Sequence, residues 1–271
     1  MSLLAVTDLT VRFGESTVVD RVSFSIERGE RLAIIGESGS GKTLTALSVI
    51  GLVPDAAMVT GSVVFEGQEL LGRRDRELSK LRGEAIAMVF QNPLTALNPL
   101  MRVGKQIAEP LRRHRDMDRA AAARAAIELC DRVGLVEPDR AARAFPHQLS
   151  GGQRQRIGIA MALACRPALL IADEPTTALD VTVQADVLGL LAELIASEET
   201  SLLFITHDVA LVPRVADDVL VMRHGAIVES GLVGAIIEAP QHPYTQQLLD
   251  AARKTALPPD EHLDEIAVGH D

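Results

Sequence analysis

The eight residues "GESGSGKT" from Gly36 to Thr43 constrain the fold of this chain more than any other stretch. They fit the phosphate-loop pattern G-x-x-x-x-G-K-[ST] and lie between the apolar run "RLAIIG" and the helical pattern "KTLTALSVIGL". A short apolar run of this kind is expected of a strand that is buried on both faces of a parallel sheet. The stretch therefore predicts a strand–loop–helix unit of an α/β fold.

The residues of this loop suit the binding of a nucleoside triphosphate. The glycines let the backbone wrap tightly, so that successive N–H groups point at phosphate oxygens, and the following helix adds the positive end of its dipole. Lys42 would reach the β- and γ-phosphates, and the Thr43 hydroxyl would bind Mg²⁺. The loop residues expected to bind the nucleotide are Gly36, Ser38, Gly39, Ser40, Gly41, Lys42 and Thr43.

A second motif, "ALLIADEPTTALD", brings two carboxylates to the end of another predicted strand. Its apolar residues deliver Asp173 and Glu174 to the C-terminal end of the strand, where open α/β sheets bind their ligands. Asp173 can hold Mg²⁺ through water beside Thr43, and Glu174 can orient or deprotonate an attacking water. Alone, the pair would also suit a solvated strand end; the phosphate loop favours the catalytic interpretation.

Further strand and helix patterns extend this unit to a mixed fold. Strand-like runs fill residues 4–35, and "VSFSI" alternates apolar and polar residues as a half-buried antiparallel strand does. Residues 103–164 have helical patterns, and strand signals return after them. Residues 217–231 predict two strands joined by a turn at His224–Gly225. The 271 residues suit one large domain or two closely packed subdomains, with a helical insertion in the middle.

Charge and composition argue against several classes of function. The formal net charge of −10 disfavours a nucleic-acid partner, because proteins that bind phosphate backbones present a basic surface. No secretion-signal pattern opens the chain, and no apolar run approaches the ~18 residues of a membrane span. Cys130 and Cys165 lack metal-binding spacing, and we do not expect a disulfide between them. Two free cysteines favour a reducing cytosol. If the protein acts at a membrane, we expect another chain to span it.

A second glycine-rich turn, the Ser-Gly-Gly of "LSGGQRQR" from Leu149 to Arg156, opens a helix far along the chain. Such a turn also offers N–H donors and a helix dipole to phosphate. One chain cannot easily aim both loops at the same γ-phosphate, but two chains that meet head to tail can. Together the three motifs resemble those of ATP-binding cassette (ABC) ATPases, over roughly residues 1–255. The resemblance implies ATP and Mg²⁺ as cofactors and a second cassette, identical or related, as a partner.

The resemblance also implies a fold and its division along the chain. The fold is a P-loop NTPase (RecA-like) core with an antiparallel β subdomain and an inserted α-helical subdomain. We expect the first part of the core with the β subdomain in residues 1–90, the helical subdomain with the signature in 91–164, the second part of the core in 165–235, and a C-terminal element with an acidic tail in 236–271. The signature residues expected to bind the partner's nucleotide are Ser150, Gly151, Gly152 and Gln153.

Single residues outside these motifs also match the family. Gln91 in "VFQNP" matches a glutamine that senses Mg²⁺ and the attacking water, and His207 in "LLFITHD" matches a histidine that contacts the γ-phosphate. Asp180 in "TTALD" matches the loop that crosses the dimer interface, and it also suits the N-cap of the next helix. Phe13 in "VRFG" matches the aromatic residue that stacks on adenine. Taken alone, Gln91 and His207 would also suit structural roles, and Phe13 a core position.

Three longer stretches resemble the ATPases of oligopeptide, dipeptide and nickel importers. They are "QNPLTALNPLMRVGKQIAE", "FPHQLSGGQRQRIGIAMALACRP" and "DEPTTALDVTVQ". The C-terminal stretch "HPYTQQLLDAA" at His242–Ala252 resembles the same ATPases. We expect import of a small solute, with peptides first and nickel, metal chelates or oligosaccharides as alternatives. A chromosome-maintenance cassette would carry a long heptad insertion, whereas only 57 residues separate Gln91 from Leu149. A translation-factor cassette would carry two ATPase units, and an exporter would have fused membrane helices.

The importer resemblance implies further partners and a location. We expect two transmembrane permease subunits, an extracytoplasmic solute-binding protein and no nucleic acid, with the chain at the cytoplasmic face of the membrane. Leu94, Leu97 and Leu100 would present an apolar patch to a short helix of the membrane subunit, or would instead pack inside the helical insertion. Some members hold an iron–sulfur cluster after the His-Pro-Tyr element, but this sequence has no cysteine beyond Cys165, so we expect none.

Overall fold

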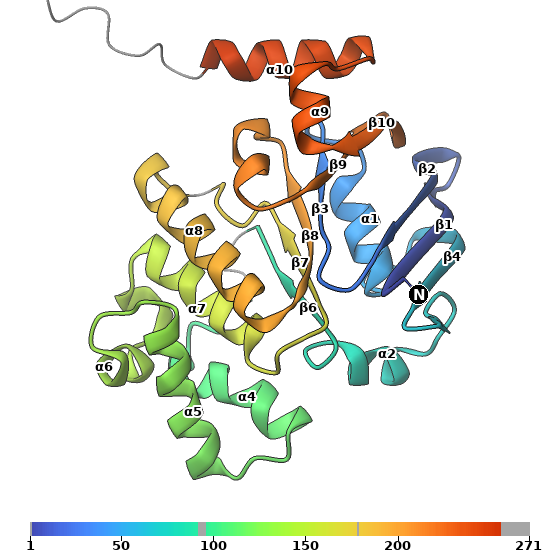
Figure 1. Cartoon of the computed structure of the whole chain (residues 1–271). Helices are drawn as coiled ribbons and strands as arrows, with labels where there is room; N and C mark the ends of the chain where they lie inside the picture. Colours follow the sequence, from blue (N-terminus) through green and yellow to red (C-terminus); the bar gives the residue numbers. More distant parts are fainter. Residues whose placement is uncertain (1, 92–95, 178, 256–271) are drawn as a thin grey trace, which may run out of the picture.

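A computed structural model describes residues 2–91, 96–177 and 179–255 (Figure 1). Its largest element is a six-stranded sheet with the strand order β10-β9-β3-β8-β7-β6. The five strands from β9 to β6 in this order run parallel, and β10 pairs antiparallel with β9. The strands are β3 (Arg31–Ile35), β6 (Ile86–Val89), β7 (Leu169–Asp173), β8 (Ser201–Thr206), β9 (Asp218–Arg223) and β10 (Ala226–Leu232).

The parallel strands are buried on both faces, as their apolar runs predict. Successive side chains of a strand point to opposite faces of a sheet. In β7, Leu170 and Ala172 therefore pack into one hydrophobic core, and Leu169 and Ile171 into another on the opposite face. The functional groups that follow these strands are consequently anchored between two packed layers.

A second, antiparallel sheet has the order β2-β1-β4-β5. Its strands are β1 (Leu4–Phe13), β2 (Ser16–Ile26), β4 (Ala57–Phe65) and β5 (Gln68–Glu69). Along β2, buried Val22 and Ile26 alternate with exposed Ser23 and Ser25, which confirms the predicted half-buried antiparallel strand. Buried residues of β1, β2 and β4 share one hydrophobic core with the helix that follows the phosphate loop.

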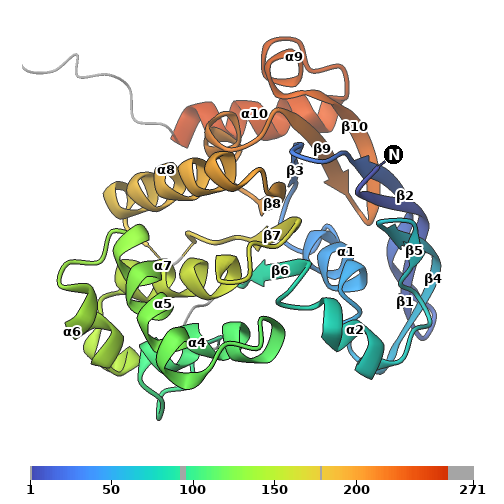
Figure 2. The same ribbon diagram turned by 60° about the horizontal axis from the view of Figure 1, so that its bottom comes forward.

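The helices cover both faces of the six-stranded sheet (Figures 1 and 2). In both views α7 and α8 lie together on one side, and α1 lies between the two sheets. Helices α4, α5 and α6 pack on one another, and α4 and α5 also pack on α7, away from α9 and α10. The helices are α1 (Lys42–Val49), α2 (Asp75–Leu81), α4 (Val103–His114), α5 (Arg119–Arg132), α6 (Pro138–Arg143), α7 (Gly151–Leu163), α8 (Val181–Glu198), α9 (Val233–Glu238) and α10 (Pro243–Thr255), with 3₁₀ turns at Pro146–Gln148 and Val209–Arg214.

These elements confirm the predicted fold class: a parallel P-loop sheet, an antiparallel β subdomain and a helical region. The hairpin of β9 and β10 turns at His224 and Gly225, whose positive φ values of 48° and 85° suit the two-residue turn that the sequence predicted. The boundaries proposed at residues 90, 164 and 235 stay predictions. Within the described part of the chain, no helix is both long and apolar enough to cross a membrane.

Candidate nucleotide site

The phosphate loop joins β3 to α1 and depends on glycine for its shape. Gly36 and Gly41 have φ values of 151° and 100°, which side-chain-bearing residues rarely adopt. A Cβ atom at Gly36 would lie 2.2 Å from the Met222 carbonyl oxygen of β9, and one at Gly41 would lie 2.8 Å from the Val18 carbonyl oxygen of β2. Neighbouring strands from both sheets therefore hold the loop closely against their backbones.

The N-terminus of α1 is open to a ligand. Its N-cap is Gly41, which has no side chain to accept a hydrogen bond from the first turn. By contrast, Ser150 caps α7 and Asp180 caps α8 through side-chain oxygens. The free N–H groups and positive dipole end of α1 suit a phosphate group.

Lys42 is folded back over the loop. Its Nζ donates to the carbonyl oxygens of Gly36 and Glu37, each at 2.8 Å, and the side chain is buried. Burial lowers the pKa of Lys42, and the nearby charges of Glu174 and Asp173 oppose that shift. The ammonium group therefore lies against the backbone of the phosphate loop, close to where a bound phosphate would lie.

Asp173, at the end of β7, faces the start of α1. The Thr43 hydroxyl donates to Asp173 Oδ1 across 3.1 Å, and Asp173 is only 4% exposed. Burial raises the pKa of Asp173 to about 6, an effect that the Thr43 hydrogen bond and the Lys42 charge offset in part. A hydroxyl and a desolvated carboxylate are hard oxygen ligands of the kind that Mg²⁺ prefers.

These donors fit a Mg²⁺ that is held jointly with phosphate. Among the residues that the structure describes, no group of three or more His, Cys, Asp or Glu side chains could hold a metal. Mg²⁺ typically takes one or two protein oxygens and completes its shell with water and substrate phosphates. Thr43 and Asp173 match that pattern.

Glu174, the residue after Asp173, contacts three polar side chains. Its φ of 45° lies in the left-handed region, and its backbone N–H donates to the Ile205 carbonyl of β8 at 2.8 Å. Gln91 Nε2 donates to its Oε2 at 2.8 Å, and the Thr177 hydroxyl donates to the same oxygen at 3.0 Å. His207 Nδ1 lies 3.0 Å from Oε1. An ionised Glu174 only accepts, so Nδ1 would carry the proton.

Gln91, Glu174 and His207 meet because each follows a parallel strand of the same sheet. They come after β6, β7 and β8, which are adjacent, and the carboxyl ends of such strands form the ligand edge of an open α/β sheet. Motif matching found these three residues but missed Thr177. Its spacing of three residues from Glu174 in "DEPTT" was the available signal.

The signature residues lie at the N-terminus of α7, and their hydrogen bonds close on one another. Gln153 N–H donates to Ser150 Oγ at 3.2 Å, and Ser150 N–H donates to Gln153 Oε1 at 2.9 Å, forming a capping box. Ser150 and Gly151 are exposed. A Cβ atom at Gly152 would lie 2.6 Å from the Val183 side chain, so glycine permits α7 to approach α8 closely.

Asp180 and Phe13 take the structural positions that the sequence also allowed, an N-cap for Asp180 and the edge of the core for Phe13. Asp180 Oδ1 accepts from Val183 N–H at 3.0 Å, which confirms the predicted N-cap of α8. Phe13, the last residue of β1, is half-buried and packs against the core between the two sheets. Its free face suits a planar ring, and β2 of the same sheet touches the phosphate loop at Gly41.

Comparisons with known proteins agree with this geometry. A family model described as "ABC transporter" matches residues 19–177. The chain belongs to the ABC transporter family. It is an ABC ATPase, which hydrolyses ATP to drive transport, as the motifs predicted.

Curated ABC proteins resemble nearly the whole chain. It is 48% identical over 253 residues to the oligopeptide transport ATP-binding protein OppD of Bacillus subtilis (strain 168), covering 91% of this chain and 71% of that protein. It is 47% identical over 256 residues to the dipeptide transport ATP-binding protein DppD of Escherichia coli (strain K12), covering 93% and 78%. Among solved structures, the dimeric post-hydrolysis state of the ATP-binding cassette MJ0796 bound to ADP and Pi matches with a TM-score of 0.75 at 29% identity, covering 85% of this chain and 98% of that one.

Proposed function

We propose that this ABC ATPase energises the import of di- or oligopeptides at the cytoplasmic face of a membrane. The observation that carries the proposal is the Glu174 carboxylate, held by Gln91 and His207 at the edge of the sheet where Thr43 contacts Asp173. The peptide class rests on the similarity to OppD and DppD, whose names describe oligopeptide and dipeptide transport.

Each side chain then has a role in hydrolysis. Lys42 and the N–H groups at the start of α1 bind the β- and γ-phosphates, and Thr43 and Asp173 provide oxygen ligands for Mg²⁺. When bound, Mg²⁺ would neutralise phosphate charge and orient the γ-phosphate. Glu174 orients the attacking water and accepts its proton, while Gln91 and His207 fix the carboxylate. Gln91 is also a candidate contact to the metal.

A second cassette would complete this site. Ser150, Gly151, Gly152 and Gln153 form an exposed helix start with its own caps, and the exposed Asp180 lies at the start of the neighbouring α8. Gly151 and Gly152 are the first two residues of α7, so their N–H groups have no partner within the helix. Facing a partner's phosphate loop head to tail, they would bind the partner's γ-phosphate. The partner cassette is a copy of this chain or a related one.

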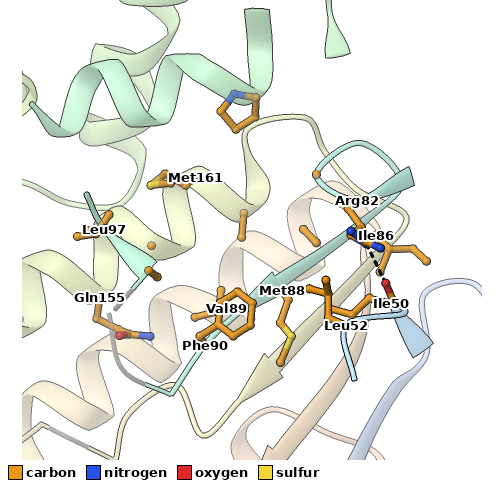
Figure 3. Close-up of a pocket in the computed structure, with 16 residues that line it drawn as sticks. Ile50, Leu52, Arg82, Ile86, Met88, Val89, Phe90, Leu97, Gln155 and Met161 are labelled. Carbon is orange, nitrogen blue, oxygen red and sulfur yellow. Dashed lines mark hydrogen bonds between the residues drawn. The ribbon is translucent and has the colours of Figure 1, made fainter. Parts of the chain in front are cut away.

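A pocket between β6 and the helical subdomain is the candidate docking site for a membrane subunit. Its volume is about 280 Å³, and it lies between residues that follow α1, the strand β6 and the helices α4 and α7 (Figure 3). Leu52 and Phe90 are 41% and 38% exposed at this pocket. Exposed apolar patches of this kind mark interfaces. An apolar face of a short helix would fit there.

One polar atom in this pocket lacks a partner. Gln155 is 1% exposed, and its Nε2 has no hydrogen-bond acceptor among the residues that the structure describes. Figure 3 shows its amide pointing toward Phe90. An unpaired buried donor costs about 1–3 kcal/mol, which a carbonyl oxygen of the docked helix would recover. The membrane subunit would thus contribute apolar side chains and one acceptor.

The apolar patch predicted after Gln91 is only partly available for this contact. Leu100 is 88% exposed, as that prediction requires. Leu97 follows the other alternative that the sequence left open, because it is 3% exposed and packs into the core of the helical region, although it also lines the pocket. Leu94 lies outside the described residues.

Docking can be tested with one charge in the pocket. Leu52→Glu places a carboxylate among apolar side chains, so the tagged chain should no longer co-purify with transmembrane subunits from detergent-solubilised membranes. Leu232→Glu, at an exposed leucine on β10, is the matched control and should co-purify normally. Retention of the membrane subunits by Leu52→Glu would exclude this docking site.

The substrate class needs the assembled complex. We would purify the complex with its membrane subunits, reconstitute it in liposomes and add the solute-binding protein that co-purifies with native membranes. A dipeptide or oligopeptide mixture should raise the ATPase rate, and a Glu174→Gln complex should show no such response. Stimulation by Ni²⁺ or an oligosaccharide, but not by peptides, would contradict peptide import.

A further inference from the structure

The His-Pro-Tyr element packs directly against the phosphate loop. Tyr244, near the start of α10, is 1% exposed, and its hydroxyl accepts a hydrogen bond from the Glu37 backbone N–H at 2.9 Å. Glu37 is the second residue of the phosphate loop. The bond therefore joins two segments that are 207 residues apart in the sequence.

Local contacts fix Tyr244 before it reaches the loop. The carboxylate of Glu229, on β10, accepts from the N–H groups of Gln241 and His242 at 2.7 and 3.1 Å. His242 Nδ1 in turn accepts from the Tyr244 N–H at 3.1 Å. The turn before α10 is thus pinned to β10, and the tyrosine ring has a set direction.

The ring also packs on the strands that support the loop. Tyr244 shares a hydrophobic core with Ile35, the last residue of β3, and with Val221 of β9. The Arg223 guanidinium lies 4.7 Å from the centre of the ring, a cation–π contact. The phenol therefore touches β3 where the loop begins, together with the strand that lies against Gly36.

The hydroxyl restrains a part of the loop that Lys42 also contacts. Lys42 Nζ donates to the Glu37 carbonyl, and the Glu37 N–H donates to Tyr244. Both polar groups of the Glu37 backbone are therefore used within the protein. A glycine-rich loop has many accessible conformations, so a bond that removes some of them prepares it for phosphate.

We propose that Tyr244 is a positioning residue that holds the phosphate loop in its nucleotide-binding shape, and that docking of α10 and nucleotide affinity are thereby coupled. By reciprocity, a bound nucleotide must stabilise the docked α10 by the same factor by which the docked helix raises nucleotide affinity. The proposal needs nucleotide binding alone. It can therefore fail while peptide import stands, and the reverse is also possible.

The test uses the full chain, with ADP as the probe so that a dimer sharing ATP does not form. Tyr244→Phe keeps the ring packing and removes the hydroxyl. Gln246→Ala is the matched control, since it also removes one hydrogen bond of α10, from Gln246 Nε2 to the Pro240 carbonyl at 2.9 Å, without approaching the loop. Tyr244→Phe should bind MgADP about 2- to 10-fold more weakly by calorimetric titration, with the control as in the wild type.

Hydrogen exchange of the α10 amides supplies the second measurement, which a merely structural tyrosine would not affect. MgADP should slow exchange across α10 in the wild type and in Gln246→Ala. The slowing should shrink in Tyr244→Phe by the factor found for affinity. Wild-type affinity in Tyr244→Phe, equal weakening in both variants, or nucleotide protection of α10 that is unchanged without the hydroxyl would each overturn the proposal.

Discussion

The side-chain amide of Gln91 donates a hydrogen bond to Glu174 Oε2 across 2.8 Å and so joins the end of β6 to the end of β7. Gln91 directly follows Phe90, which lines the pocket proposed to bind a membrane subunit. The hydrogen bond therefore places a neighbour of that pocket in contact with the candidate catalytic carboxylate.

Glu174→Gln should lower the rate of ATP hydrolysis by ~10²–10⁴ and leave ATP binding unchanged. The amide keeps the size and two of the hydrogen-bonding positions of the carboxylate, but it cannot accept a proton from water. Steady-state turnover and ATP titration measure the two effects. Glu15→Gln, at an exposed glutamate in the β1–β2 turn, is the control. Near wild-type turnover in Glu174→Gln would remove this residue from the mechanism.

Thr177→Val should have a smaller effect, because Thr177 only holds the carboxylate through its 3.0 Å hydrogen bond to Oε2. Loss of one such bond predicts a fall in kcat of about 2- to 10-fold with little change in the affinity for ATP. The measurement is a kcat and KM comparison with the wild type. Unchanged kcat would show that Gln91 and His207 suffice to hold Glu174.

Lys42→Ala should weaken ATP binding by about 10- to 100-fold, since it removes a charge-assisted contact worth roughly 1.5–3 kcal/mol. The variant also loses both hydrogen bonds to the loop carbonyls. Titration with ATP measures the affinity, and thermal unfolding separates it from any loss of stability. An affinity equal to that of the wild type would contradict the role of the loop lysine.

Because Asp173 is buried, its ionisation should lower the stability of the nucleotide-free chain as the pH rises. Burial raises the pKa of Asp173 from 3.8 to about 6, so the folded chain binds this proton more tightly than the unfolded chain does. The stability that proton binding gives the folded chain is fully present below pH 3.8 and is lost as the pH rises through about 6. Asp173→Asn removes this titration. The wild type should lose free energy of unfolding between about pH 4 and pH 6, and Asp173→Asn should not. The difference between the two chains should therefore change in favour of the variant by on the order of 3 kcal/mol. Chemical denaturation in EDTA measures the free energy of unfolding of both chains. If this free energy depends on pH in the same way in the wild type and in Asp173→Asn, the result would contradict a buried carboxyl group at residue 173.

The sequence predicted those parts of the site that depend on regular structure. Asp173 and Glu174 could be assigned to a strand end because apolar runs identify buried strands and their carboxyl ends share one edge. Asp180 was predicted as an N-cap from its place before a helical pattern. In each case the controlling interaction is local or follows from the strand order.

Other contacts could not be predicted because they depend on packing between distant segments. Thr177 is the exception, because it lies three residues from Glu174 and that spacing was a local signal which the motif comparison did not use. The Tyr244–Glu37 bond requires the register of β9 and β10 beside β3. Leu97 is buried because the helical subdomain packs over it, and its spacing from Leu100 carried no information on which would be exposed.

The central claim is that two cassettes share the nucleotide, with Ser150 of one facing the phosphate loop of the other. Glu174→Gln, which is expected to hydrolyse ATP far more slowly than the wild type, should form a dimer in MgATP. Adding Ser150→Arg places bulk and charge where the partner's γ-phosphate would lie, but leaves the chain's own phosphate loop intact. A control with Val136→Arg, another exposed position of the helical subdomain, should still form the dimer.

Light scattering of these variants with saturating MgATP is the most direct measurement. The account predicts a dimer for Glu174→Gln and for its Val136→Arg derivative, and a monomer that still binds ATP with unchanged affinity for the Ser150→Arg derivative. A Ser150→Arg derivative that dimerises as well as Glu174→Gln alone, or that no longer binds ATP as a monomer, would contradict the shared site.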